Sequence, residues 1–186
     1  MPVRICGNGH SVNSYALLDN GSDINIISEK LASNLRLRTE THEIRVESLG
    51  KVDESARKVA DVTVEGLNGF SVKLEDTVFG DIVTSGEVEL PTADVVSGYG
   101  HCTGVEFVDF PGESIVHRGI GMIIGSKYAW TWSKGERRVG ENDQPIAIHS
   151  CFGWGLLGPK QSSSASRSGC CHHVCRFFAR VQRRRK

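Results

Sequence analysis

The chain has 186 residues, 39% of them apolar, which is enough for one domain with a sizeable buried core. Its formal net charge of zero is unevenly distributed, because the residues from Lys160 onward include eight Lys or Arg and no acid, whereas those before it include 14 basic and 22 acidic side chains. No apolar run approaches the roughly 18 residues of a membrane span and residues 1–10 lack a signal-peptide pattern, so we expect a cytoplasmic protein, with a nuclear location as the alternative.

The first predicted elements are a β-hairpin and the loop that follows it. Residues 3–6 and 12–18 are apolar-rich runs separated by Gly7-Asn8-Gly9, which is typical of a tight turn. The second run leads directly into Asp19-Asn20-Gly21-Ser22, and another apolar run follows at residues 24–27. An Asp at the end of a buried strand, above a glycine that lets backbone N–H groups reach the carboxylate, is typical of an aspartic peptidase. Asp-Asn-Gly between apolar runs is also typical of an ordinary hairpin, so this segment alone leaves both interpretations open.

One short helix and several strands are predicted behind this loop. Ser28 is a candidate helix cap, with Leu31 and Leu35 on one face of the helix. Alternating or continuous apolar side chains then predict strands at residues 44–46, 59–64, 70–74, 120–124 and 146–156. The first two of these strands form a predicted hairpin with Leu49-Gly50 at its tip, and the glycines among residues 91–119 predict loops.

Three sequence blocks occur in a defined order along the chain. They are A-L-L-D-N-G-S-D-I-N-I-I from Ala16, I-G-M-I-I-G-S-K-Y from Ile120 and H-S-C-F-G-W-G-L-L-G from His149. In order and approximate spacing they resemble the aspartic peptidase domain (DUF1758-type) in polyproteins of Pao/BEL-type LTR retrotransposons, a relative of retroviral proteases. The resemblance implies an all-β, retropepsin-like closed β-barrel with one or two short helices and one lobe per chain, over a domain of residues 1–159.

The same resemblance implies an aspartic endopeptidase with Asp19 as its catalytic residue and its own polyprotein as substrate. Peptide hydrolysis by this route uses two carboxylates that share one proton, because one takes a proton from water while the other donates to the scissile carbonyl. The chain has one strand-borne Asp-x-Gly and about half the length of a two-lobed enzyme, so Asp19 is expected to pair with Asp19 of a second copy. The expected partners are therefore a second copy of the chain and a polypeptide, with no cofactor.

Seven further residues receive roles from this resemblance. Asn20, Gly21 and Ser22 are expected to support the catalytic loop, and Asp23, Leu49, Gly50 and Ile124 are expected to bind substrate. Leu49 and Gly50 fall at the tip of a flap, a hairpin that closes over an extended peptide and excludes water. An ordinary surface hairpin is the alternative for that segment.

Two positions depart from the family pattern. The residue after the catalytic Asp is Ser or Thr in most retroviral proteases, where its hydroxyl hydrogen-bonds to the partner loop, whereas Asn20 offers an amide that donates and accepts. Lys127 stands where the family often has Asp, at a position that would support the loop. Both favour an alternative function, in which a catalytically inactive retropepsin-like domain acts as a dimerising or peptide-binding module.

Residues 160–186 are predicted to be a Ser-rich linker followed by a disordered basic tail. The Cys and His residues between 170 and 175 suggest zinc, but adjacent ligands are hard to place around a tetrahedral ion, so no metal site is predicted. The Arg-rich end is a weak signal for nucleic-acid binding.

Overall fold

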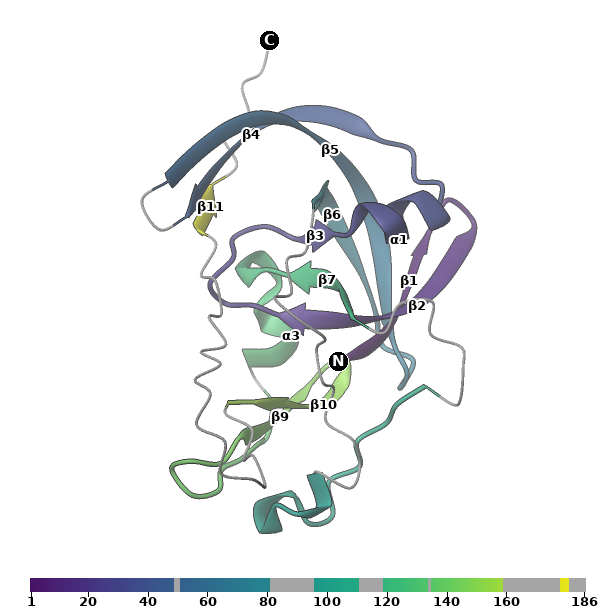
Figure 1. Ribbon diagram of the computed structural model, residues 1–186. Coiled ribbons are helices and arrows are strands. Elements are labelled where there is room, and N and C mark those ends of the chain that lie inside the picture. Colours follow the sequence, from purple (N-terminus) through teal and green to yellow (C-terminus); the bar gives the residue numbers. More distant parts are fainter. Residues whose placement is uncertain (49–50, 81–95, 111–118, 134, 159–177, 181–186) are drawn as a thin grey trace.

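The structure is a computed structural model that describes residues 1–48, 51–80, 96–110, 119–133, 135–158 and 178–180 (Figure 1). Strands predominate in these residues, and the helical segments are short. They include α1 (Glu29–Asn34), α3 (Trp130–Ser133) and the 3₁₀ turns η1 (Gly100–Cys102) and η2 (Ser126–Tyr128). The predicted all-β class with short helices is therefore confirmed. None of the helices in these ranges is long and apolar enough to cross a membrane.

The strands belong to two sheets. The larger sheet has eight strands in the order β1-β2-β7-β3-β6-β5-β4-β11, and β5 also pairs with β1, so the pairings β1-β2-β7-β3-β6-β5 return to β1. These strands are β1 (Pro2–Gly7), β2 (His10–Leu18), β3 (Ile26–Ile27), β4 (Glu40–Ser48), β5 (Lys51–Gly66), β6 (Ser71–Phe79), β7 (Ile120–Ile124) and β11 (Phe178–Arg180). The smaller sheet has the order β10-β9-β8, from β8 (Arg137–Arg138), β9 (Ile146–Ser150) and β10 (Gly153–Leu157).

The β1–β2 hairpin turns at Asn8 and Gly9, as the sequence predicts. Gly7 pairs with His10, and the φ angles of Asn8 and Gly9 are 49° and 77°. Two consecutive positive φ angles are those of a type I′ turn, whose twist matches that of paired antiparallel strands. The turn therefore fixes the register in which β2 approaches Asp19.

β7 lies between β2 and β3 and pairs with both. It therefore holds both ends of the loop that connects β2 to β3. It runs parallel to β2, with Leu18 opposite Ile124, and antiparallel to β3, with Ile26 opposite Ile123. Met122, Ile123 and Ile124 are all buried, as expected for a continuous apolar run with strands on both sides. Because β2 and β3 both pair with β7 and are not neighbours in the sheet, the ordinary-hairpin interpretation of Asp-Asn-Gly is wrong.

α1 packs its apolar face onto the main hydrophobic core. Ser28 caps its first turn, as predicted, with its Oγ accepting a hydrogen bond from Leu31 N at 3.4 Å. Leu31 and Leu35 are 0% exposed and lie among core residues of β1, β2, β5, β6 and β7. The helix that follows the Asp19 loop is thus fixed to the same core as β2 and β7.

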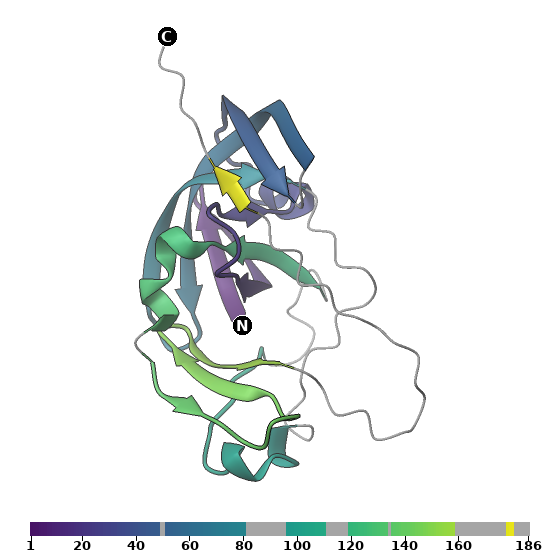
Figure 2. The ribbon, with the colours of Figure 1, turned by 90° about the vertical axis from the view of Figure 1, so that its left-hand side faces the viewer.

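β4 and β5 form a long hairpin that arches over the loop following β2 (Figures 1 and 2). Ser48 pairs with Lys51, so Leu49 and Gly50 connect the two strands, and these two residues lie outside the described residues. β5 is longer than the predicted 59–64 because it continues from the hairpin into the main sheet, where it pairs with β6 and β1.

The single strand predicted over residues 146–156 is wrong, because the chain turns back in its middle to form the β9–β10 hairpin. Ser150 Oγ accepts a hydrogen bond from Phe152 N (3.1 Å) and donates to Gly153 O (2.9 Å), and Gly153 has a φ of 107°. The apolar alternation continues through the turn, so periodicity does not reveal it.

The basic tail contains a strand. β11 pairs antiparallel with β4, with Ala179 opposite Val46. The sequence predicts a disordered tail and does not predict this strand at residues 178–180, and the other residues between 160 and 186 lie outside the described residues. The physical reason is the outer edge of β4, since the unpaired backbone groups of an edge strand accept an added strand.

Truncation of Leu31 tests the packing of α1. Leu31→Ala should lower the free energy of unfolding by about 2–5 kcal/mol, because it removes buried methyl groups and leaves a cavity under the helix. The matched control is Leu157→Ala, at a side chain that is 57% exposed. Urea denaturation followed by circular dichroism measures both, and equal effects would contradict the packing.

Candidate active site

Asp19 lies at the end of β2, where its backbone is tied to β7. Its N–H donates to the Ile124 carbonyl oxygen at 3.0 Å, which carries the β2–β7 contact one residue beyond the strand. The residue is 4% exposed, although Asn20 beside it is exposed. The carboxyl group is therefore largely shielded from solvent and does not project from a hairpin tip.

Gly21 brings its backbone N–H to the Asp19 carboxylate. The N–H donates to Asp19 Oδ1 at 2.8 Å, which is the contact that the sequence predicts for this glycine. A hydrogen bond of this kind stabilises the ionised carboxylate. In the residues that the structure describes, neither Asp19 nor Asp23 forms an ion pair with a basic side chain.

Ser22 fastens the loop from inside. Its side chain is 0% exposed, and its Oγ donates to the Ile24 carbonyl at 2.9 Å and accepts from Ile24 N at 3.4 Å. Its own carbonyl oxygen accepts a hydrogen bond from Ser126 N at 2.7 Å. Ser22 therefore links the loop to the residues that directly follow β7.

Asn25 provides a second link, which sequence reasoning misses. This buried side chain accepts a hydrogen bond at Oδ1 from Gly125 N at 3.0 Å. A signal for it was present, because Asn25 interrupts the apolar run from Ile24 to Ile27, and a buried amide within an apolar strand needs a partner.

Gly125 is required where β7 passes the loop. A Cβ atom added at this position would clash with the Ile24 carbonyl oxygen and lie 2.7 Å from the Ser22 carbonyl oxygen. Both contacts are with backbone atoms, which cannot turn away as a flexible side chain can. The glycine that ends the predicted apolar run is therefore explained by the close approach of two backbone segments.

Asp23 lies at the exposed rim of the loop. Ser126 Oγ donates to its Oδ1 at 3.0 Å, which fixes the direction of the carboxylate. The substrate contact predicted for Asp23 stays a prediction.

Lys127 takes no part in holding the loop. Its Nζ lies 3.6 Å from Glu75 Oε2 and 5.6 Å from the centre of the Tyr128 ring, so the side chain extends toward β6. The bonds that hold the loop come from Gly125, Ser126 and Asn25. The departure from the family pattern at Lys127 therefore removes none of them.

Four further residues were predicted for the site, and their outcomes differ. Asn20 is exposed, and its side chain makes no hydrogen bond with other described residues. Ile124 is 0% exposed in the main core, which does not favour the direct substrate contact predicted for it, and its carbonyl group is what reaches Asp19. Leu49 and Gly50 lie outside the described residues.

Tyr15 links β2 to Asp109 and Phe110. Its hydroxyl donates to Asp109 Oδ1 at 2.7 Å, and its ring meets Phe110 edge to face at 5.9 Å. Burial, together with this hydrogen bond, raises the pKa of Tyr15 above its usual range, so the phenol remains a donor.

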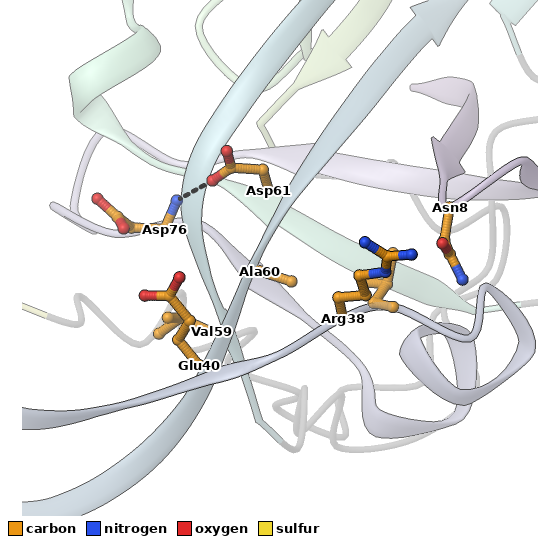
Figure 3. Close-up of a pocket in the computed structure, with 8 residues that line it drawn as sticks. Asn8, Arg38, Glu40, Val59, Ala60, Asp61 and Asp76 are labelled. Atoms are coloured by element: carbon orange, nitrogen blue, oxygen red, sulfur yellow. Dashed lines mark hydrogen bonds between the residues drawn. The ribbon is translucent and has the colours of Figure 1, made fainter.

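A pocket of about 430 Å³ lies elsewhere, between the β1–β2 turn, β4, β5 and β6 (Figure 3). Its lining includes Asp61, whose carboxylate pairs with Lys73 at 2.7 Å and accepts a hydrogen bond from Asp76 N at 3.2 Å. The hydrogen bond from Lys73 lowers the pKa of Asp61. No residue predicted for the active site lines this pocket. Across the described ranges, no three His, Cys, Asp or Glu side chains gather as a metal site.

Comparison with known proteins gives no match, since no family model, no curated protein and no solved structure is similar to the chain. The resemblance to retrotransposon peptidases stays a prediction from three sequence blocks.

Substitution of Gly125 tests the close approach under the loop. Gly125→Ala should lower the free energy of unfolding by about 1–3 kcal/mol, because the new methyl group forces two backbone segments apart. Gly100→Ala is the matched control, since a Cβ atom there meets nothing within 4 Å. Thermal and urea unfolding of both variants provide the measurement. A Gly125 variant as stable as the Gly100 variant would show that the two segments are not in contact.

Proposed function

We propose that the chain is a retropepsin-like aspartic endopeptidase of retrotransposon origin that acts as a homodimer. The observation that carries this proposal is the setting of Asp19, which is buried at the end of β2, in a loop tied to β7, with the Gly21 N–H on its carboxylate. The strand pairings that return to β1 support a closed barrel of the acid-protease type, with one lobe per chain.

A second carboxyl group is required by the chemistry and is expected from a second copy of the chain. Two carboxyl groups at short range cannot both ionise comfortably, so the pair titrates as a unit and keeps one proton over a range of pH. Asp19 has no basic partner among the described residues, so no ion pair there competes with a second carboxyl group. Asn20, next to Asp19, is exposed, and in such a dimer its amide would hydrogen-bond to the loop of the partner.

The pair of carboxyl groups performs hydrolysis by general acid–base catalysis. Water adds its oxygen to the scissile carbonyl carbon while one of its protons passes to the ionised carboxylate, and the protonated carboxyl donates to the carbonyl oxygen. The tetrahedral intermediate then breaks its C–N bond as the amine leaving group takes the proton that water gave up. The second carboxyl recovers its own proton from the intermediate, so the pair ends as it began.

The β4–β5 hairpin supports an extended polypeptide as the substrate. It arches over the loop that carries Asp19, so a peptide between them would be covered on one side by the hairpin and on the other by Asp19 and Asp23 (Figure 1). Such a cover excludes water from the carboxyl groups and holds the peptide in place. The chain's own polyprotein is the substrate that we expect.

Asp19→Asn should reduce peptide cleavage at least about 100-fold, because the amide neither takes nor gives the proton. The variant keeps an oxygen that accepts from Gly21 N–H, so its unfolding transition should match that of the unaltered chain. Asp61→Asn is the matched control and should cleave normally. Peptides that span candidate polyprotein junctions, incubated at mildly acid pH, provide the assay. Cleavage by Asp19→Asn at the unaltered rate would remove the assignment.

Mixing the unaltered chain with the Asp19→Asn variant tests the shared site. If the two kinds of chain associate at random in equal amounts, only about one quarter of the dimers contain two intact carboxyl groups, and activity should fall to that fraction. If each intact carboxyl group acted alone, activity would fall to about one half, and if one intact group per dimer sufficed, it would fall to about three quarters. Sedimentation analysis of the mixture establishes that dimers are present, and either of these two results with dimers present would exclude a shared site.

The alternative is an inactive domain of the same fold that dimerises or binds peptides. The exposed Asn20 in place of Ser or Thr is the observation that favours it. A statine-type transition-state mimic separates the two functions, because cleavage that the mimic suppresses excludes the inactive module. Peptide binding without cleavage in the unaltered chain would support it.

A further inference from the structure

The outer edge of β4 accepts an extended segment of the chain's own tail. The register pairs Phe178 with Glu47, Ala179 with Val46, and Arg180 with Arg45, in the antiparallel sense. The paired part of β4 directly precedes the tip of the hairpin. β11 is thus added to the hairpin by strand pairing, which is a common mode of peptide recognition at a sheet edge.

β11 also lies close to the candidate active site. In Figure 1 it hangs beneath the end of the β4–β5 hairpin, and in Figure 2, turned by 90°, it lies in front of the hairpin and just above the loop between β2 and β3. The two views agree that β11 is between the hairpin and the loop that carries Asp19. An extended substrate would have to enter the same space.

Charge favours the same placement of the tail. The residues before Lys160 have eight more acids than bases, and those from Lys160 onward have eight bases and no acid. Asp19 and Asp23 of the loop have no basic partner among the described residues. Asp53 and Glu54 of β5 are already paired with Arg57 and Arg45, and Arg45 lies opposite Arg180, so the favourable charge comes from the loop acids and from the acidic body of the chain. A basic segment held beside these acids gains electrostatic energy that an acidic segment would lose.

We propose that the edge of β4 is a binding site for an extended basic peptide and that residues 178–180 occupy it in cis, in competition with the substrate. The pairing of β11 is independent of catalysis, whereas the competition rests on the proposed function. A strand of three residues gives little affinity by itself. Residues 159–177 tether it to the same chain, however, so its effective concentration is far above that of a free peptide. The tail then acts as a built-in competitor that a tighter-binding substrate displaces.

A proline in β11 tests the pairing in the full chain. Ala179→Pro removes a backbone N–H and disfavours strand pairing, so amide protons of residues 45–47 that face β11 should exchange with deuterium at least about tenfold faster. Ala165→Pro, in the same tail but outside the paired residues, is the matched control and should leave this exchange unchanged. Unchanged exchange in Ala179→Pro would overturn the proposal.

A peptide added in trans distinguishes strand recognition from charge alone. The peptide R-F-F-A-R-V-Q-R-R-R-K, residues 176–186, should slow the exchange of residues 45–47 in the Ala179→Pro chain, and a scrambled peptide of equal composition should not. If both peptides slowed the exchange of residues 45–47 equally, binding would be a non-specific attraction between charges. That result would overturn the proposal.

Cleavage assays then test the competition. Ala179→Pro should lower the KM for a junction peptide several-fold, while Ala165→Pro leaves it unchanged. An unchanged KM in Ala179→Pro, with faster exchange at residues 45–47, would remove the competition but keep the pairing. If no variant cleaves, the proposed peptidase function fails, and hydrogen exchange alone still decides whether β11 binds β4.

Discussion

The hydrogen bond from Asp19 N to the Ile124 carbonyl oxygen joins two parts of the chain that lie far apart in sequence, and the candidate site depends on it. It continues the parallel pairing of β2 with β7 past the end of β2, at the point where the chain would otherwise leave the sheet. The bonds from Gly125 to Asn25 and from Ser126 to Ser22 fasten the other side of the loop to the same strand end. Because these hydrogen bonds hold both ends of the loop, the Asp19 carboxyl group stays buried and keeps one orientation.

Local signals in the sequence predicted the parts of the fold that depend on neighbouring residues. Asn8-Gly9 predicted a tight turn because those residues tolerate positive φ, and Ser28 predicted a helix start because its side chain satisfies a free backbone N–H. The continuous apolar run before Gly125 predicted a buried strand. Each of these follows from the chemistry of a few adjacent residues.

Features that depend on distant contacts could not be obtained in this way. The position of β7 between β2 and β3 is set by pairings across about a hundred residues, and only those pairings explain why position 125 must be glycine. The role of Asn25 depends on the same contact. The β9–β10 turn was missed because the apolar alternation does not change there, and β11 was missed because an edge strand provides the template on which it forms.

β5 runs without interruption from the hairpin into the main sheet, and this continuity governs how the hairpin can move. The pairing of β5 with β6 shifts register between Ala60 and Val62, where Asp76 has a φ of 51° and its N–H donates to the Asp61 carboxylate. Such a bulge bends a strand and increases its twist. The hairpin is therefore anchored at this bulge, where β5 enters the main sheet and pairs with β6 and β1. If the hairpin moves for an incoming peptide, as the proposed function requires, β5 transmits the force into the sheet that also holds β1, and the movement bends the fold as a whole.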